Sequence, residues 1–221
     1  HGQAIPVAPV GPPVARLRKT GKIWSKADCS GDDGLIVGGA DYFSIQPDLL
    51  FGRTAPLEVE IGAGRGDFII GRAATYPNRN FLAVELSISL AQLVASRAAS
   101  VGVTNLRIAR VDARPLVNLF LPSGSINAYY IYFPDPWPKT RHAKHRLFTH
   151  FFVANLYRTL ASGASLHVAT DVRDYADSMF SLIREHGFSR SGEPVAGLEA
   201  TAFARKFMTE GRTLYGAVFI K

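Results

Sequence analysis

Cysteine is almost absent from this sequence of 221 residues. Cys29 is the only one, which excludes a disulfide within the chain and any zinc site that uses several cysteines. A lone thiol fits a reducing compartment, so we expect a cytoplasmic protein. Long apolar runs are missing too, since no stretch of the sequence approaches the ~18 consecutive apolar residues that span a membrane. The chain opens with His1 and Gly2 and shows no charged-then-apolar leader, so we expect no signal peptide.

Acidic residues are scarce relative to basic ones. Eighteen Asp and Glu residues oppose 25 Lys and Arg residues, which gives a formal net charge of +7. The excess gathers in two segments: within residues 1–30 five basic residues face only Asp28, and from Lys139 to Arg146 four face no acid. Clustered positive charge favours a polyanionic partner such as a nucleic acid. Two clusters indicate a binding footprint rather than a uniformly basic surface.

Residues 1–25 contain many prolines and glycines and no sustained hydrophobic period, so they are expected to form a flexible basic arm. Residues 26–221 are expected to form one domain, because a hydrophobic fraction of 47% is enough for a sizeable core.

Short apolar runs alternate with longer amphipathic stretches from residue 57 onward. The expected strands are Leu57–Ile61, Asn80–Val84, Leu106–Val111, Ile126–Tyr132 and Ser165–Ala169, with a late strand at Leu214–Ile220. The expected helices are Asp67–Tyr76, Leu86–Val101, Ala113–Phe120, His145–Leu160 and Asp174–His186. This alternation predicts an α/β fold: a doubly wound, mostly parallel sheet with helices on both faces. The late strand is expected to pair antiparallel at an edge.

A glycine-rich loop follows the first expected strand. It reads Glu60-Ile61-Gly62-Ala63-Gly64-Arg65-Gly66. Glycines let the backbone turn tightly and approach a ligand without a Cβ in the way. A dinucleotide site requires G-x-G-x-x-G, and Asp67 stands where the third glycine would be, which disfavours a nicotinamide oxidoreductase. The pattern acid-x-Gly-x-Gly-x-Gly instead resembles the nucleoside-binding loop of Rossmann-like methyltransferases.

Two more acids follow the next two expected strands. Glu85 comes after the second strand, where a carboxylate can accept both ribose hydroxyls of a nucleoside. Asp112 comes after the third strand, where methyltransferases commonly contact the adenine amino group. Either side chain can instead be a helix N-cap. Together with Glu60 they lie on the edge at which open α/β sheets bind ligands, so we interpret the three acids as one cofactor site.

The segment after the fourth expected strand reads Phe133-Pro134-Asp135-Pro136-Trp137-Pro138-Lys139. Its three prolines fix φ and push the preceding residues toward extended conformations, so the segment is stiff. Asp can accept hydrogen bonds from guanine N1 and N2, and an aromatic ring can stack on the base. The basic residues that follow are expected to contact RNA phosphates; they are Arg141, Lys144 and Arg146.

Together these motifs resemble the tRNA (guanine-N7-)-methyltransferase family from about residue 57 to the C-terminus. The resemblance implies S-adenosylmethionine as the cofactor and a guanine in the variable loop of tRNA as the target. It implies that the cofactor contacts are Glu60, Gly62, Gly64, Gly66, Glu85, Asp112 and Asp135. Asp135 is also implied to be catalytic, and further substrate contacts are implied for Lys139, Asp171, Thr201 and Phe203.

Two positions depart from the family pattern. The family motif Thr-x-Phe-Glu reads Thr201-Ala202-Phe203-Ala204, and the family's Gly-His reads Gly211-Arg212. The missing carboxylate leaves open how the cofactor or the target base is held, unless Glu199 or Glu210 substitutes for it. Two alternatives therefore stay open: a small-molecule N-methyltransferase acting on a purine-like heterocycle, and an RNA-binding module with a degenerate cofactor site. No metal and no membrane partner is expected, and monomer and homodimer are both open.

Overall fold

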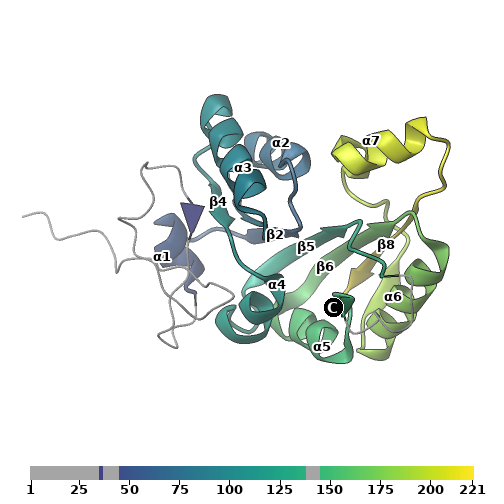
Figure 1. Ribbon diagram of the computed structural model, residues 1–221. Helices are drawn as coiled ribbons and strands as arrows, with labels where there is room; N and C mark the ends of the chain where they lie inside the picture. Colours follow the sequence, from purple (N-terminus) through teal and green to yellow (C-terminus); the bar gives the residue numbers. More distant parts are fainter. Residues whose placement is uncertain (1–34, 37–44, 138–144) are drawn as a thin grey trace, which may run out of the picture.

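A twisted sheet of eight strands runs through the middle of the molecule, in the order β1-β4-β3-β2-β5-β6-β8-β7 (Figure 1). The computed structural model describes residues 35–36, 45–137 and 145–221. The strands are β1 (Leu35–Ile36), β2 (Leu57–Ile61), β3 (Asn80–Val84), β4 (Leu106–Ala109), β5 (Ile126–Tyr132), β6 (Leu160–Thr170), β7 (Ser189–Ser191) and β8 (Tyr215–Ile220). Neighbouring strands pair in parallel except at β8, which runs antiparallel to both β6 and β7. The predicted α/β fold class is confirmed.

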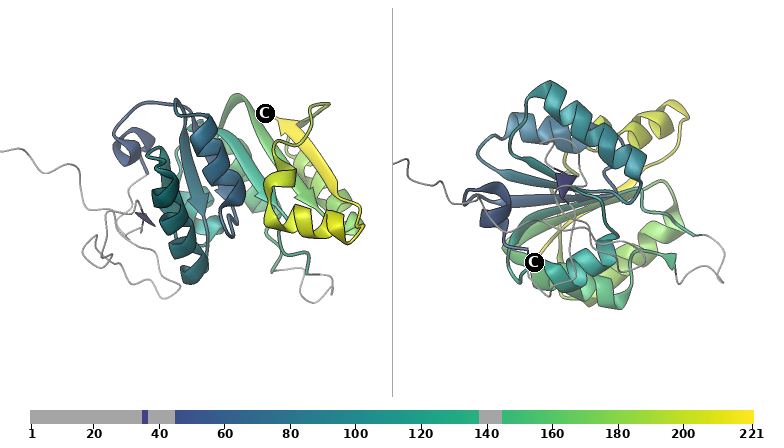
Figure 2. Two further views of the ribbon diagram at one scale, coloured as in Figure 1. Left: turned by 90° about the horizontal axis from the view of Figure 1, so that it is seen from above. Right: turned by 60° about the vertical axis from the view of Figure 1, so that its left-hand side comes forward.

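Helices cover both faces of this sheet (Figure 2). On one face lie α2 (Asp67–Thr75), α3 (Ile88–Val101), the short η4 (Leu198–Ala200) and α7 (Ala202–Thr209). On the other lie α4 (Ala113–Pro115), the π-helix η2 (Leu116–Phe120), α5 (His150–Thr159) and α6 (Arg173–Glu185). A short helix, α1 (Pro47–Phe51), precedes β2. The strands between these two layers are buried, as expected for parallel strands covered on both sides.

Strand β2 shows how the sequence divides between the two faces. Its apolar residues Leu57, Val59 and Ile61 belong to the core beneath α5 and α6. Glu58 and Glu60 alternate with them and therefore point to the face covered by α2. Both glutamates are buried, so the chain places two carboxyl groups in the interior under α2.

Several elements differ from the sequence-based expectation. The single helix expected over Ala113–Phe120 is a short α4 followed by η2, in which the Leu121 amide donates to the carbonyl of Leu116 at 3.1 Å. Arg158 of α5 donates to two carbonyls of this π-turn, at 2.9 Å for Val117 and 3.1 Å for Leu121, and so stabilises it.

Helix α5 begins at His150 rather than at residue 145, because the Thr149 hydroxyl caps it by accepting from the Phe152 amide at 3.2 Å. Strand β6 is longer than expected and begins directly at Leu160. The late strand is confirmed as antiparallel, but β7 pairs with its outer side. The expected flexible arm, residues 1–25, lies outside the described residues, as do the expected RNA contacts Lys139, Arg141 and Lys144.

Candidate active site

The glycine loop joins β2 to α2 at the carboxyl edge of the sheet. Gly62, Gly64 and Gly66 have φ values of 79°, 55° and 75°, in the region that favours glycine. A Cβ on Gly66 would lie 2.9 Å from Val94, so this glycine also lets the loop pack directly on α3. The amides of Gly62 and Ala63 donate to the Val84 carbonyl at 2.8 and 3.1 Å. These bonds fix the loop against the end of β3.

Glu60 lies at the start of this loop and is 4% exposed. Its Oε2 atom is buried and has no hydrogen-bond partner among the described residues. Burial raises the pKa of this carboxyl well above its ordinary value; the backbone of Ile69 lowers it in part, and the charges of Asp67 and Glu85 raise it again. Because buried polar atoms are normally paired, an unpartnered carboxyl oxygen beside a glycine loop fits a ligand that donates a hydrogen bond or carries positive charge.

Glu85 links the loop to the end of β3. One of its carboxylate oxygens accepts from the Gly64 amide at 2.9 Å, and the other accepts from the Ser87 amide at 2.8 Å. Each carboxylate oxygen has two lone pairs, so these bonds leave capacity for the hydroxyl groups of a ligand. Glu85 thus holds the loop in place and still offers an acceptor at the sheet edge.

Asp112 is the N-cap of α4, the alternative that the sequence left open. It accepts from the Arg114 amide at 2.9 Å and forms a looser ion pair with the Arg114 guanidinium at 3.4 Å. The side chain is 43% exposed, so capping does not close it off from a ligand. The Glu85 amide donates to the Ala109 carbonyl at 3.0 Å, which brings the ends of β3 and β4 together.

Asp135 lies on the segment that leaves β5, the strand next to β2. The segment turns sharply, since Phe133 and Trp137 have φ values of 53° and 40°. The Phe133 amide donates to the Ala169 carbonyl of β6 at 2.8 Å, and Asp135 itself is exposed. The structure therefore places the predicted catalytic acid at the same sheet edge as Glu60.

Arg146 lies where the described chain resumes after this segment. Its Nε donates to the Pro136 carbonyl at 2.9 Å, and its Nη2 lies 3.4 Å from the Trp137 carbonyl. The guanidinium carbon lies 5.2 Å from the centroid of the buried Tyr175 ring. The guanidinium is thus engaged with the backbone on which Asp135 sits.

Asp171 follows β6 and forms an ion pair with Arg212 at 2.6 Å. Arg212 also bonds Glu210 at 2.9 Å, and its guanidinium stacks 4.5 Å from the centroid of Phe207 in α7. Sequence reasoning noted Arg212 only as a departure from the family pattern. The charge of Asp171 gave the only signal for this contact, because the two residues lie 41 positions apart and leave no local pattern.

The C-terminal motif begins helix α7. Thr201 is its N-cap and accepts from the Ala204 amide at 3.1 Å, so its side chain is committed to the helix start. Ala204, at the position of the family glutamate, is fully buried. Phe203 is 54% exposed, with its ring 6.0 Å from that of Phe133. Of the two glutamates that could replace the family's carboxylate, Glu210 pairs with Arg212, which also pairs with Asp171. Glu199 is exposed.

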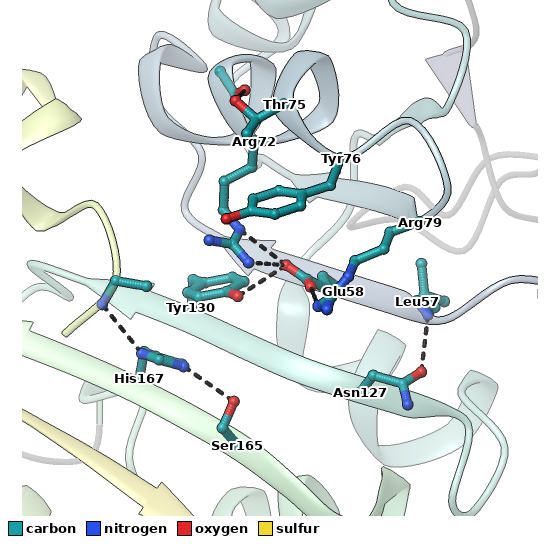
Figure 3. Close-up of polar contacts among 12 residues, drawn as sticks. Leu57, Glu58, Arg72, Thr75, Tyr76, Arg79, Asn127, Tyr130, Ser165 and His167 are labelled. Atoms are coloured by element: carbon teal, nitrogen blue, oxygen red, sulfur yellow. Dashed lines mark hydrogen bonds and ion pairs between the residues drawn. The ribbon is translucent and has the colours of Figure 1, made fainter. Parts of the chain in front are cut away.

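A buried charge cluster escaped the sequence analysis (Figure 3). Glu58, fully buried, accepts from Arg72 at 2.9 Å and from the Tyr130 hydroxyl at 2.8 Å, and it also pairs with Arg79. In the sequence its only signal is a second glutamate in an otherwise apolar strand. Because its partners come from α2, β5 and the turn before β3, we interpret it as a structural tie between these elements.

Asp67, at the third position of a dinucleotide motif, also has a structural role here. It pairs with Arg97 of α3 at 2.7 Å and with Arg205 of α7 at 3.5 Å. Three helices on one face therefore meet at this carboxylate. Among the described residues, no group of three or more His, Cys, Asp or Glu side chains is placed to hold a metal ion. Within the same ranges, no helix combines the length and apolar character needed to cross a membrane.

Comparisons with known proteins agree with this geometry. A family model described as a putative methyltransferase matches residues 54–217. The tRNA (guanine-N(7)-)-methyltransferase of Nitrosomonas eutropha is 37% identical over 182 residues, 80% of this chain and 81% of that protein. The protein of the same name from Sodalis glossinidius is 34% identical over 214 residues, 93% and 90% of the two chains.

Solved structures show the same fold. The 16S rRNA methyltransferase KamB has a TM-score of 0.59 at 17% identity, over 77% of this chain and 90% of that one. A SAM-dependent methyltransferase from Aquifex aeolicus has a TM-score of 0.53 at 10% identity, over 75% and 81%. At such low identity the likeness concerns the fold alone. The matches to the Nitrosomonas and Sodalis proteins extend over most of this chain and most of each relative. These matches show that this chain belongs to the tRNA (guanine-N7-)-methyltransferase family.

Proposed function

We propose that this protein transfers a methyl group from S-adenosylmethionine to N7 of a guanine in the variable loop of tRNA. The observation that carries the proposal is the adjacency of β2 and β5, which pair in parallel up to Ile61 and Ile131. The glycine loop leaves one strand and the Asp135 segment leaves the other, so a nucleoside site and an acid–aromatic segment share one edge of the sheet. A tRNA substrate also supports the expected cytoplasmic location.

The residues at this edge fit the cofactor. The unpartnered Oε2 atom of Glu60 suits a positively charged amino group, and the remaining lone pairs of Glu85 suit ribose hydroxyls. Asp112 caps α4 but its side chain remains 43% exposed, so it suits the amino group of adenine. The backbone of Gly62, Gly64 and Gly66 forms the floor of this site. When bound, S-adenosylmethionine supplies an electrophilic methyl group on its sulfonium.

The acceptor side is proposed around Asp135. Guanine N7 carries a lone pair and no proton, so no general base is needed to make it nucleophilic. Asp135 fixes the base through its N1 and N2 hydrogens and stabilises the positive charge that develops on the ring. Positioning and electrostatics then provide most of the rate enhancement.

The tRNA itself is proposed to contact residues around this acid. Besides Asp135 these are Lys139, Arg141, Lys144, Asp171, Thr201 and Phe203. Asp171 pairs with Arg212, whose guanidinium stacks on Phe207. Phe207 in turn packs against Phe133, at the start of the Asp135 segment. Phe203 contacts Phe133 directly. Thr201 contributes by capping the N-terminus of α7, the helix that carries Phe203.

Methyl transfer to unmodified tRNA tests the proposal. The protein is incubated with methyl-labelled S-adenosylmethionine and tRNA transcript, and the tRNA is digested to nucleosides. We expect the label in 7-methylguanosine, and we expect Asp135→Asn to reduce it strongly while Glu193→Gln, an exposed acid, does not. Label transferred only to a free purine-like heterocycle would support the small-molecule alternative, which the missing carboxylate at Ala204 motivates. Failure to bind S-adenosylhomocysteine in titration calorimetry would support a degenerate cofactor site.

A further inference from the structure

One residue on each side of Asp135 has a backbone conformation that costs free energy. Phe133 and Trp137 are the only non-glycine residues with positive φ in the described part of the chain. Left-handed backbone is unfavourable for a residue that carries a side chain. Contacts from outside the segment must therefore hold both turns, and the direction of the Asp135 side chain depends on them.

The turn at Phe133 is held by β6 and α7. Its amide donates to the Ala169 carbonyl at 2.8 Å. Its ring packs edge-on against Phe207 at 5.3 Å between centroids and contacts Phe203 at 6.0 Å. These contacts anchor the start of the segment to the main body of the fold.

The turn at Trp137 is held by Arg146. The guanidinium reaches the carbonyls of both Pro136 and Trp137, the last two described residues before the gap. Its other side lies over the ring of Tyr175, which is 2% exposed and belongs to the first turn of α6. A planar guanidinium can bond two carbonyls and stack on a ring at the same time, which an ammonium cannot do.

Tyr175 lies close enough to the acceptor segment to be affected by its charges. Burial raises the pKa of Tyr175 to about 12, with Asp135 adding to the rise, whereas the Phe148 backbone and the charges of Arg146 and Arg114 lower it. The carboxylate, the guanidinium and the phenol therefore form one local group, with Tyr175 as its buried member.

We propose that Arg146 is a positioning residue for Asp135, supported by the ring of Tyr175, and that it does not act as a phosphate contact. The inference rests on the proposed function and deepens it. Arg146 holds the carbonyls of Pro136 and Trp137, fixes the strained turn between them, and thereby sets the direction of the Asp135 carboxylate. The Nε and Nη2 groups that hold the segment are thereby committed to backbone carbonyls.

Arg146→Lys and Arg146→Ala test this role, with the exposed Arg184→Ala as the matched control. Methyl transfer is measured in a single turnover at saturating tRNA and cofactor, and tRNA affinity is measured over a range of salt concentrations. We expect both Arg146 variants to lower the maximal rate by about 10- to 100-fold, with tRNA Kd and its salt dependence unchanged.

A phosphate contact would give the opposite result. Arg146→Lys would then keep nearly the wild-type rate, because it keeps the charge. Arg146→Ala would raise the tRNA Kd, make the plot of log K against log salt shallower by about 0.7 to 0.9, and leave the maximal rate unchanged. Either of these outcomes would overturn the inference.

Tyr175→Phe and Tyr175→Leu test the supporting ring. The phenylalanine variant keeps the ring and is expected to retain the rate within about twofold, whereas the leucine variant is expected to lower it as Arg146→Ala does. A thermal melt of each variant verifies folding. A rate loss of the same size in Tyr175→Phe would assign the effect to the hydroxyl and contradict the proposal.

Fluorescence provides a readout that needs no methyl transfer. In a Trp24→Phe background, Trp137 is the only tryptophan, so its emission reports the end of the segment. We expect Arg146→Ala to shift this emission without tRNA, and Arg184→Ala to leave it unchanged. An unshifted spectrum in Arg146→Ala would refute the positioning role, whereas a wild-type protein that makes no 7-methylguanosine would refute only the proposed function.

Discussion

Glu60, which we propose to bind the cofactor, also makes the stability of the fold depend on pH. Folding raises the pKa of this carboxyl above its ordinary value of 4.5, mainly because the side chain is buried. The protonated form therefore stabilises the folded state. That contribution is fully present below the pKa of the unfolded chain and is lost as pH rises through the folded pKa.

Glu60→Gln is expected to stabilise the protein without ligand and to weaken cofactor binding. The neutral amide resembles the protonated acid, so the free energy of unfolding at pH 7.5 should rise by about 1–2 kcal/mol, and the gain should vanish below about pH 4.5. Urea denaturation over this pH range measures the first effect. The Kd for S-adenosylhomocysteine should rise at least about tenfold, while Glu193→Gln changes neither quantity. A destabilised Glu60→Gln protein with normal ligand affinity would contradict this account.

His167 shows the opposite dependence on pH. Burial lowers its pKa from 6.5 to about 4; the charge of Arg72 lowers it further, and Glu58 acts in the other direction. The imidazole accepts from the Ala196 amide at 3.3 Å, and its other nitrogen lies 3.0 Å from the Ser165 hydroxyl (Figure 3). The neutral ring therefore stabilises the fold above pH 6.5, and this contribution is lost as pH falls from 6.5 to about 4.

His167→Asn removes this titration and keeps an acceptor near the Ala196 amide. Between pH 7 and pH 4 we expect the wild type to lose roughly 3 kcal/mol more stability than the variant, since each pKa unit is worth about 1.4 kcal/mol. Denaturant titrations at matched pH values check this, and contributions from other groups cancel in the difference. Parallel pH profiles for the two proteins would show that His167 titrates normally.

Helix α7 is held by contacts with residues distant in the sequence, among them Asp67 and Phe133. It was not predicted from the sequence, because its eight residues are too few for a clear period and its cap motif was assigned only to the substrate. In contrast, β2, β3 and β5 have the predicted bounds, because β3 and β5 are mostly apolar and β2 has an apolar residue at every second position. The short β7 was missed for the opposite reason: its residues Ser189–Ser191 are polar and pair only at the edge.

Asp67 ties α7 to the helices beside it, and a double-mutant cycle can measure how strongly. We expect a coupling of about 1 kcal/mol between Asp67 and Arg97, which are well aligned and partly buried. For Asp67 and Arg205 we expect less than about 0.5 kcal/mol, because the pair is longer and Arg205 is 55% exposed. The exposed pair of Arg173 and Asp177 serves as a control with little coupling. Equal couplings for all three pairs would refute this ranking.

At the scale of the whole molecule, the positions of the proposed site residues were easier to predict than the contacts that hold them. Glu60, Glu85, Asp112 and Asp135 could be placed at one edge because each lies at or shortly after the end of a strand, and parallel strands bring such positions together. The ion pair of Arg212 with Asp171 could not be predicted in this way. It joins positions that are distant in sequence, and it becomes visible only when β8 is placed beside β6.

The net charge of +7 leads to a prediction for the whole chain. Residues 1–25 contain four basic residues, and deleting them is expected to raise the tRNA Kd at least about tenfold at 0.15 M salt. If each contacts one phosphate, the plot of log K against log salt becomes shallower by about 3. Filter binding over a salt series measures both effects, and a full-length variant with these four residues changed to Gln separates charge from chain length. Unchanged affinity in both variants would argue against an RNA-binding arm.

The position of β8 also has a consequence for protein synthesis. This strand lies between β6 and β7, so the sheet cannot be completed until residues 215–220 have left the ribosome. A nascent chain that has released β2 through β6 can already form the glycine loop and the cofactor edge. Its β6, eleven residues long, meanwhile presents an open hydrogen-bonding edge to any other strand nearby. We expect translation to assemble β2 through β6 first, and to leave the edge of β6 exposed to aggregation until β8 arrives.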